Sequence, residues 1–66
     1  MTGKEAIKKL QAMGWILDGV SGSHHIMYKP GHRPVSVPVH GNRDLGVGLL
    51  RCLERATGVK MRSQSH

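Results

Sequence analysis

Two adjacent histidines follow a glycine and a serine in the segment Gly22-Ser23-His24-His25. Glycine and serine are typical turn residues, so we expect a turn that leads directly into a strand beginning at His24. Successive side chains on a strand point to opposite faces, which would expose one histidine and direct the other toward the interior. An exposed imidazole gains and loses a proton near neutral pH, and it can therefore act as a general acid or base.

RNA is a substrate that suits so small a site. Its 2′-hydroxyl is a nucleophile next to the scissile phosphate, so the protein has only to move a proton, align the groups and stabilise negative charge. One histidine of the pair, helped by Lys29, Arg33 and backbone amides, would suffice for this chemistry. The alternative is that His24 and His25 are ordinary strand residues.

A metal site is the competing interpretation of the histidines. The chain has ligand types that zinc accepts, at His24, His25, His32, His40 and Cys52. Their spacing argues against such a site, because there is no Cys-x-x-Cys pair and no His-x-x-x-His repeat. We therefore predict no metal and no cofactor, and we interpret Cys52 as a structural residue.

The charge of the chain predicts a polyanionic partner. Lys and Arg number 10 against 4 Asp and Glu, which gives a net charge of +6 in 66 residues. Such a field attracts nucleic acid, an anionic membrane or an acidic protein, although net charge also simply keeps small proteins soluble. Trp15 and Tyr28 are the only aromatic residues, so stacking of several bases is not supported. The residues that we predict to contact RNA are Lys4, Lys8, Lys9, Ser23, Lys29, Arg33 and Arg43.

The chain is predicted to work in the cytoplasm. No apolar run approaches the roughly 20 residues of a membrane-spanning helix, and the first residues lack the apolar region of a signal peptide. Cys52 is the only cysteine, so an internal disulfide is impossible, as suits a reducing compartment.

The pattern of apolar residues predicts an α+β domain over residues 1–59, followed by a disordered basic tail at 60–66. Thr2 and Glu5 form a capping-box pattern at the start of a helix over 2–13. Strands are expected at 15–20, 24–29 and 34–39, and a second helix at 45–57. Three short strands joined by turns predict an antiparallel sheet, with both helices packed on one of its faces.

Finer features of this plan can also be predicted. The valines at 35, 37 and 39 alternate, so they share one face of the third strand, which we expect to be buried. Gly58 stands where a helix C-cap belongs. The apolar stripe of the second helix is predicted to consist of Leu49, Leu50, Leu53 and Ala56.

Taken in order, several short segments resemble the HicA (YcfA-like) toxins of bacterial toxin–antitoxin pairs. The resemblance covers about residues 4–59. It begins with a lysine-rich helix that ends in Met13-Gly14-Trp15. It continues through Gly22-Ser23-His24-His25-Ile26, Val35-Ser36-Val37-Pro38-Val39-His40, Asp44-Leu45-Gly46-Val47-Gly48-Leu49-Leu50-Arg51 and Ala56-Thr57-Gly58-Val59. The chain departs from the family pattern in the glycine-rich stretch 46–48 and in the tail after Lys60.

The resemblance implies a fold like that of double-stranded-RNA-binding domains, and cleavage of mRNA without the ribosome. It also implies a HicB-type antitoxin that covers the active face. The functional histidine of the family falls on His24, with His25 as the second candidate. We therefore predict a metal-independent endoribonuclease toxin. The alternatives are a non-catalytic RNA-binding module and an inactive relic that binds only its antitoxin.

Overall fold

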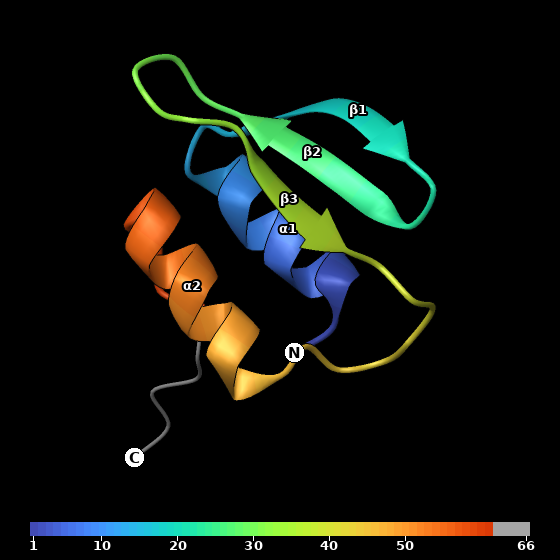
Figure 1. Ribbon diagram of the computed structural model, residues 1–66. Coiled ribbons are helices and arrows are strands. Elements are labelled where there is room, and N and C mark those ends of the chain that lie inside the picture. Colours follow the sequence, from blue (N-terminus) through green and yellow to red (C-terminus); the bar gives the residue numbers. More distant parts are fainter. Residues whose placement is uncertain (62–66) are drawn as a thin grey trace.

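The structure, a computed structural model, describes residues 1–61 and has the predicted order of elements (Figure 1). Two helices flank three strands, and their bounds are α1 Gly3–Ala12, β1 Ile16–Ser21, β2 His24–Tyr28, β3 Val35–Pro38 and α2 Val47–Thr57. The strands form one antiparallel sheet in the order β1-β2-β3, so β2 is the central strand. The predicted α+β architecture is confirmed.

Helix α1 begins at a complete capping box. The Thr2 hydroxyl accepts a hydrogen bond from the Glu5 N–H at 3.2 Å, and the Glu5 carboxylate accepts one from the Thr2 N–H at 2.8 Å. These reciprocal bonds satisfy two amides that a helix leaves unpaired at its start. Gly14, with φ of 95°, follows the last turn and allows the chain to reverse toward β1.

Helix α2 begins two residues later than predicted, at Val47. Its N-cap is Gly46, which has no side chain to bond the first amides, and Gly48 adds further backbone freedom. The end of the helix is as predicted, because Gly58 adopts a left-handed conformation with φ of 75° and donates its N–H to the Glu54 carbonyl at 2.7 Å.

The predicted apolar stripe of α2 is wrong at one position. Leu50 and Leu53 are buried and Leu49 is half-buried, but Ala56 is exposed and Thr57 is buried in its place. The Thr57 hydroxyl donates a hydrogen bond to the Leu53 carbonyl at 2.6 Å. This bond pairs the polar atom within the helix, so that threonine can occupy a buried position at little cost.

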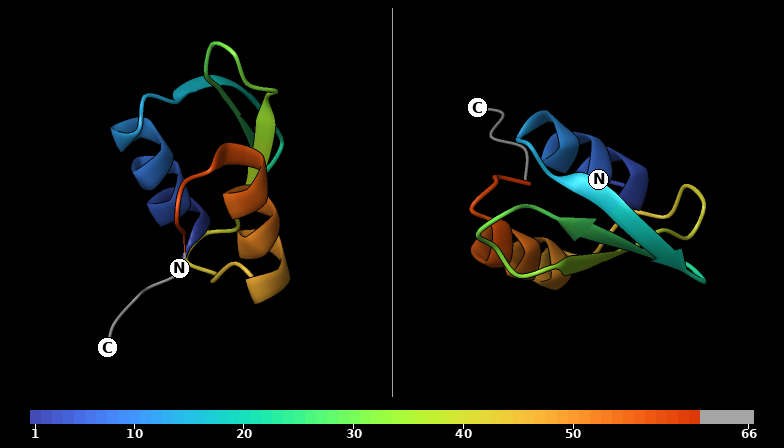
Figure 2. Two further views of the ribbon diagram at one scale, coloured as in Figure 1. Left: turned by 90° about the vertical axis from the view of Figure 1, so that its left-hand side faces the viewer. Right: turned by 90° about the horizontal axis from the view of Figure 1, so that it is seen from above.

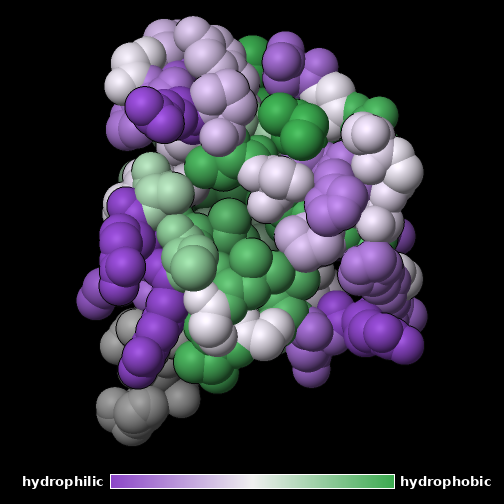
Figure 3. All heavy atoms as spheres, viewed as in Figure 1, coloured by the Kyte–Doolittle hydropathy of each residue, from purple (hydrophilic) through white to green (hydrophobic). Residues whose placement is uncertain are grey.

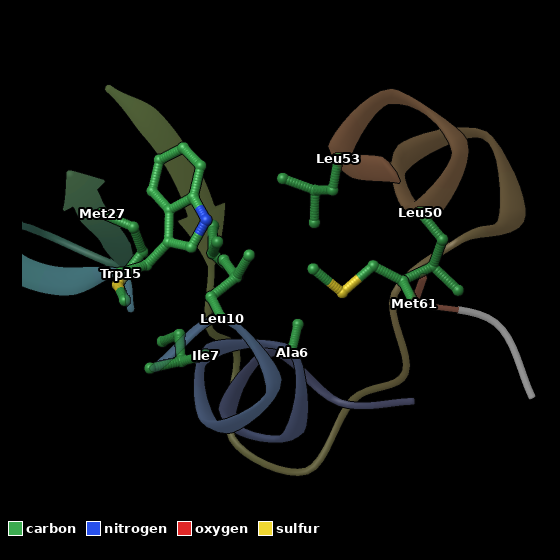
Figure 4. Close-up of a cluster of buried hydrophobic side chains, with 9 residues drawn as sticks. Ala6, Ile7, Leu10, Trp15, Met27, Leu50, Leu53 and Met61 are labelled. Atoms are coloured by element: carbon green, nitrogen blue, oxygen red, sulfur yellow. The ribbon is translucent and has the colours of Figure 1, made fainter. Parts of the chain in front are cut away.

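The core lies between the two helices and one face of the sheet, here called the inner face. Met27 of β2 and Val37 of β3 project from the sheet into this core. In the left view of Figure 2 the sheet extends from α1 across to α2. Figure 4 shows side chains of α1 and α2 pointing toward one another from opposite sides. The opposite face of the sheet carries no helix among the described residues, and we call it the open face.

Met61 completes the core from beyond α2. Its side chain is 0% exposed and extends between the helices toward Ala6 (Figure 4). Its N–H donates to a carboxylate oxygen of Glu54 at 2.9 Å. The folded part of the chain therefore continues to Met61, past the predicted domain end at residue 59. The rest of the predicted disordered tail, 62–66, lies outside the described residues.

Strand β1 is an edge strand that is exposed along its whole length. Ile16, Leu17 and Val20 are 54%, 44% and 56% exposed, although all three are large apolar residues. The pairing with β2 is interrupted between Leu17 and Gly19, which leaves Asp18 in a bulge. In the view of Figure 3, apolar atoms also reach the surface between α2 and the sheet. Leu49 and Val35 are half-buried and pack against the core. None of the helices described is long and apolar enough to cross a membrane.

Candidate active site

The turn Gly22-Ser23 joins β1 to β2 and delivers His24 as the first residue of β2. Ser21 pairs with His24 across the hairpin, so the loop has only two residues. Gly22 has φ of 61°, which a residue with a side chain rarely adopts. The tight turn therefore fixes the position of His24 relative to both neighbouring strands.

The two histidines lie on opposite faces of the sheet, as the strand alternation predicts. His25 is half-buried, pairs with the buried Val37 and shares the inner face with Met27. His24 is exposed and lies on the open face. An imidazole on the open face is accessible to a polymer the size of RNA, whereas one on the inner face is partly covered by the core.

A serine of the neighbouring strand holds the His24 ring. Ser36 pairs with Ile26 while His24 pairs with Pro38, so Ser36 and His24 are diagonal neighbours on the open face. The Ser36 Oγ lies 3.3 Å from His24 Nδ1, at hydrogen-bond distance. With Nδ1 engaged in this way, Nε2 is the nitrogen left for a substrate. Sequence reasoning did not single out Ser36, although the alternation of Val35 and Val37 already placed it on the face away from the core.

His25 has a different environment. Its Nδ1 is buried and has no hydrogen-bond partner in residues 1–61. A buried polar atom without a partner costs free energy, and His25 lies on the inner face, opposite the buried Val37. It is less suited than His24 to meet a large substrate.

The predicted RNA contacts do not converge on one surface. Ser23 adjoins His24, and Arg43 lies in the loop that follows β3. This loop begins beside Ser23, because the Val39 N–H donates to the Ser23 carbonyl at 2.7 Å. Lys29 and Arg33 follow the other end of β2, where the Lys29 ammonium donates to the Met13 carbonyl at 2.9 Å. The remaining three, Lys4, Lys8 and Lys9, are exposed on α1, which packs on the inner face.

The potential metal ligands of the described residues do not form a cluster. Among residues 1–61, no three His, Cys, Asp or Glu side chains gather closely enough to hold a metal ion. Cys52 is exposed on α2. His32 packs against Trp15, with ring centroids 5.2 Å apart and planes tilted by 53°. The indole of Trp15 is only 2% exposed, so this residue belongs to the core and is not a platform for bases.

The arrangement is thus a solvent-facing histidine, oriented by a hydroxyl, on the open sheet face of a small basic α+β domain. No curated protein matches the chain. A family model does match it, over residues 3–59, and that model describes the HicA toxin of bacterial toxin–antitoxin systems. Since the match spans most of the 66 residues, the chain belongs to the HicA toxin family.

Proposed function

We propose that this toxin is an endoribonuclease that cleaves mRNA in the cytoplasm without a metal ion, with His24 as its acid–base residue. The observation that supports this most strongly is the His24–Ser36 contact on the open face, which holds an accessible imidazole in one orientation. The net charge of +6 favours a polyanionic substrate.

The reaction uses the 2′-hydroxyl of RNA as the nucleophile. When Nδ1–H of His24 donates to the Ser36 hydroxyl, Nε2 carries a lone pair and can accept the 2′-hydroxyl proton. The 2′-oxygen then attacks the adjacent phosphorus and expels the 5′-oxygen of the next nucleotide. The products are a 2′,3′-cyclic phosphate and a 5′-hydroxyl. Ser23, which adjoins His24, and Arg43, in the loop that follows β3, are the contacts that we propose for the phosphate.

An acidic HicB-like antitoxin is the proposed partner, and it acts by covering the open face. The site is a surface feature of a thin domain, so direct masking requires only complementary shape and charge. The complex is expected to lose RNA binding and cleavage together, with protection of the amides of residues 22–29 from hydrogen exchange. A complex that binds RNA normally, with those amides unprotected, would rule out masking.

Incubation of the purified protein with RNA in a chelating buffer tests the enzymatic proposal. Cleavage by the wild type that is absent from a folded His24→Ala variant supports a metal-independent nuclease. Retention of RNA without cleavage favours the non-catalytic binding module. A protein that neither cuts nor retains RNA, yet binds its antitoxin, is an inactive relic.

A further inference from the structure

A second histidine, His40, follows β3 at the end of the sheet that carries His24. His24 pairs with Pro38, and the next residues along, Ser23 and Val39, are joined by the 2.7 Å hydrogen bond from the Val39 N–H to the Ser23 carbonyl. β3 ends at Pro38, and Val39 packs against the core. His40 is the next residue and is exposed, so the Val39–Ser23 bond brings it to the turn that delivers His24.

The loop that carries His40 is tied at both ends. Its first residues continue the pairing of β3 with the turn at Ser23. Its far end is held by the chain start: Leu45 donates its N–H to the Met1 carbonyl at 2.7 Å, and the Met1 ammonium lies 3.2 Å from the Asp44 carboxylate. Within the loop, the Arg43 N–H donates to the His40 carbonyl at 3.1 Å, which closes a turn. His40 is exposed, so its imidazole is accessible on this anchored loop.

The other described histidines are unsuitable as a second acid–base group. His25 lies on the inner face with its Nδ1 buried. His32 packs on Trp15 after the far end of β2. That end is about 13 Å from His24, since a strand rises roughly 3.3 Å per residue over the four steps from His24 to Tyr28. Tyr28 and Lys29 share this distant end, and the Lys29 ammonium already bonds the Met13 carbonyl.

The proposed reaction requires two proton transfers. One group takes the 2′-hydroxyl proton as the 2′-oxygen bonds to phosphorus, and another gives a proton to the 5′-oxygen as its bond to phosphorus breaks. We propose that His40 is this second group, the general acid that protonates the leaving 5′-oxygen, while His24 is the base. After one turnover His24 has gained a proton and His40 has lost one, and exchange with water restores both. This inference rests on the endoribonuclease function proposed above.

A substrate with a good leaving group distinguishes the two roles. Nitrophenolate leaves without a proton, so a uridine 3′-(4-nitrophenyl phosphate) requires the base but not the acid. We expect His40→Ala to lose about 10²–10⁴-fold in RNA cleavage, yet to cleave the nitrophenyl ester nearly as fast as the wild type. His24→Ala is expected to lose both activities. The matched control is His32→Ala, which removes an imidazole at the other end of β2 and should keep both activities.

Each result has a definite meaning. A wild type that cleaves RNA while His40→Ala cleaves it equally well overturns the role of His40 and leaves the proposed function intact. Equal losses on RNA and on the nitrophenyl ester also overturn it, because a general acid would affect only the poor leaving group. His40→Asn, which keeps a polar side chain in the loop, is measured alongside, with circular dichroism to show that both variants fold. A wild type that cleaves neither substrate instead contradicts the nuclease proposal itself.

Discussion

A histidine lies near each end of β2, and the two have different surroundings. At the end near Tyr28, His32 covers the buried Trp15 and Lys29 caps a helix carbonyl, so the polar side chains there stabilise the fold. At the other end, the His24 ring faces solvent and lies at hydrogen-bond distance from the Ser36 hydroxyl. The two rings therefore differ in their surroundings, because one packs on the core whereas the other is exposed and lies beside a hydroxyl.

The largest effect is expected from His24→Ala. Loss of a positioned acid–base group should lower RNA cleavage by about 10²–10⁴-fold, while the exposed position leaves the melting temperature nearly unchanged. An RNA gel and circular dichroism measure the two quantities. Full activity in a folded His24→Ala protein would refute the assignment, and loss of activity in His25→Ala alone would mean that the functional face is the inner one.

Near the opposite end of β2, Trp15→Ala should lower the free energy of unfolding rather than remove a group that takes part in RNA cleavage. Removing a buried tryptophan typically costs about 3–5 kcal/mol, a large share of the stability of so small a domain. Urea unfolding followed by circular dichroism gives this value. A loss below about 1 kcal/mol would show that this end does not anchor the core.

RNA affinity should fall steeply with salt, because cations rather than aromatic rings supply the contacts. For single strands the slope of log affinity against log salt is near −0.7 per neutralised phosphate, so four contacts give about −3. Arg43→Ala, at the His24 end, should make the slope shallower by one contact, whereas Arg33→Ala, at the far end, should change it less. A flat dependence in the wild type would show that the basic residues do not carry the binding.

Ser36→Ala should have the smallest effect. One hydrogen bond contributes about 0.5–1.5 kcal/mol, so cleavage should fall roughly 2–12-fold, and Ser36→Thr, which keeps a hydroxyl, should restore part of it. The nitrogen chemical shifts of the His24 ring report its tautomer directly. Unchanged shifts and unchanged activity in Ser36→Ala would show that the serine does not orient the ring.

Local signals predicted much of the fold and the placement of the two adjacent histidines of the candidate site. The capping box at Thr2, the cap at Gly58 and the separation of His24 from His25 depend on neighbouring residues, and each is present in the structure. Ser36 was missed as a member of the candidate site, because it contacts His24 through a strand register that sequence alone does not give.

Other differences arise from long-range packing. Met61 follows the last helix in a polar stretch, and only its approach to Ala6 between the helices reveals it as a core residue. Leu17 and Val20 have the apolar character of buried strand residues, yet they lie on an edge strand and remain exposed. The residues next to such a side chain in the sequence do not show whether it is buried, because burial depends on elements that are distant in the chain.

The bridge between Thr2 and Asp44 has a consequence for the order in which the molecule folds. The hairpin that presents His24 joins adjacent segments, and hairpins form in about 1–10 μs. The contact of Thr2 with Asp44 closes the segment that contains α1 and all three strands, so it must wait until these elements have condensed. The loop with His40 is therefore set in place late and should be the first part to open on warming, while the hairpin with His24 is still formed.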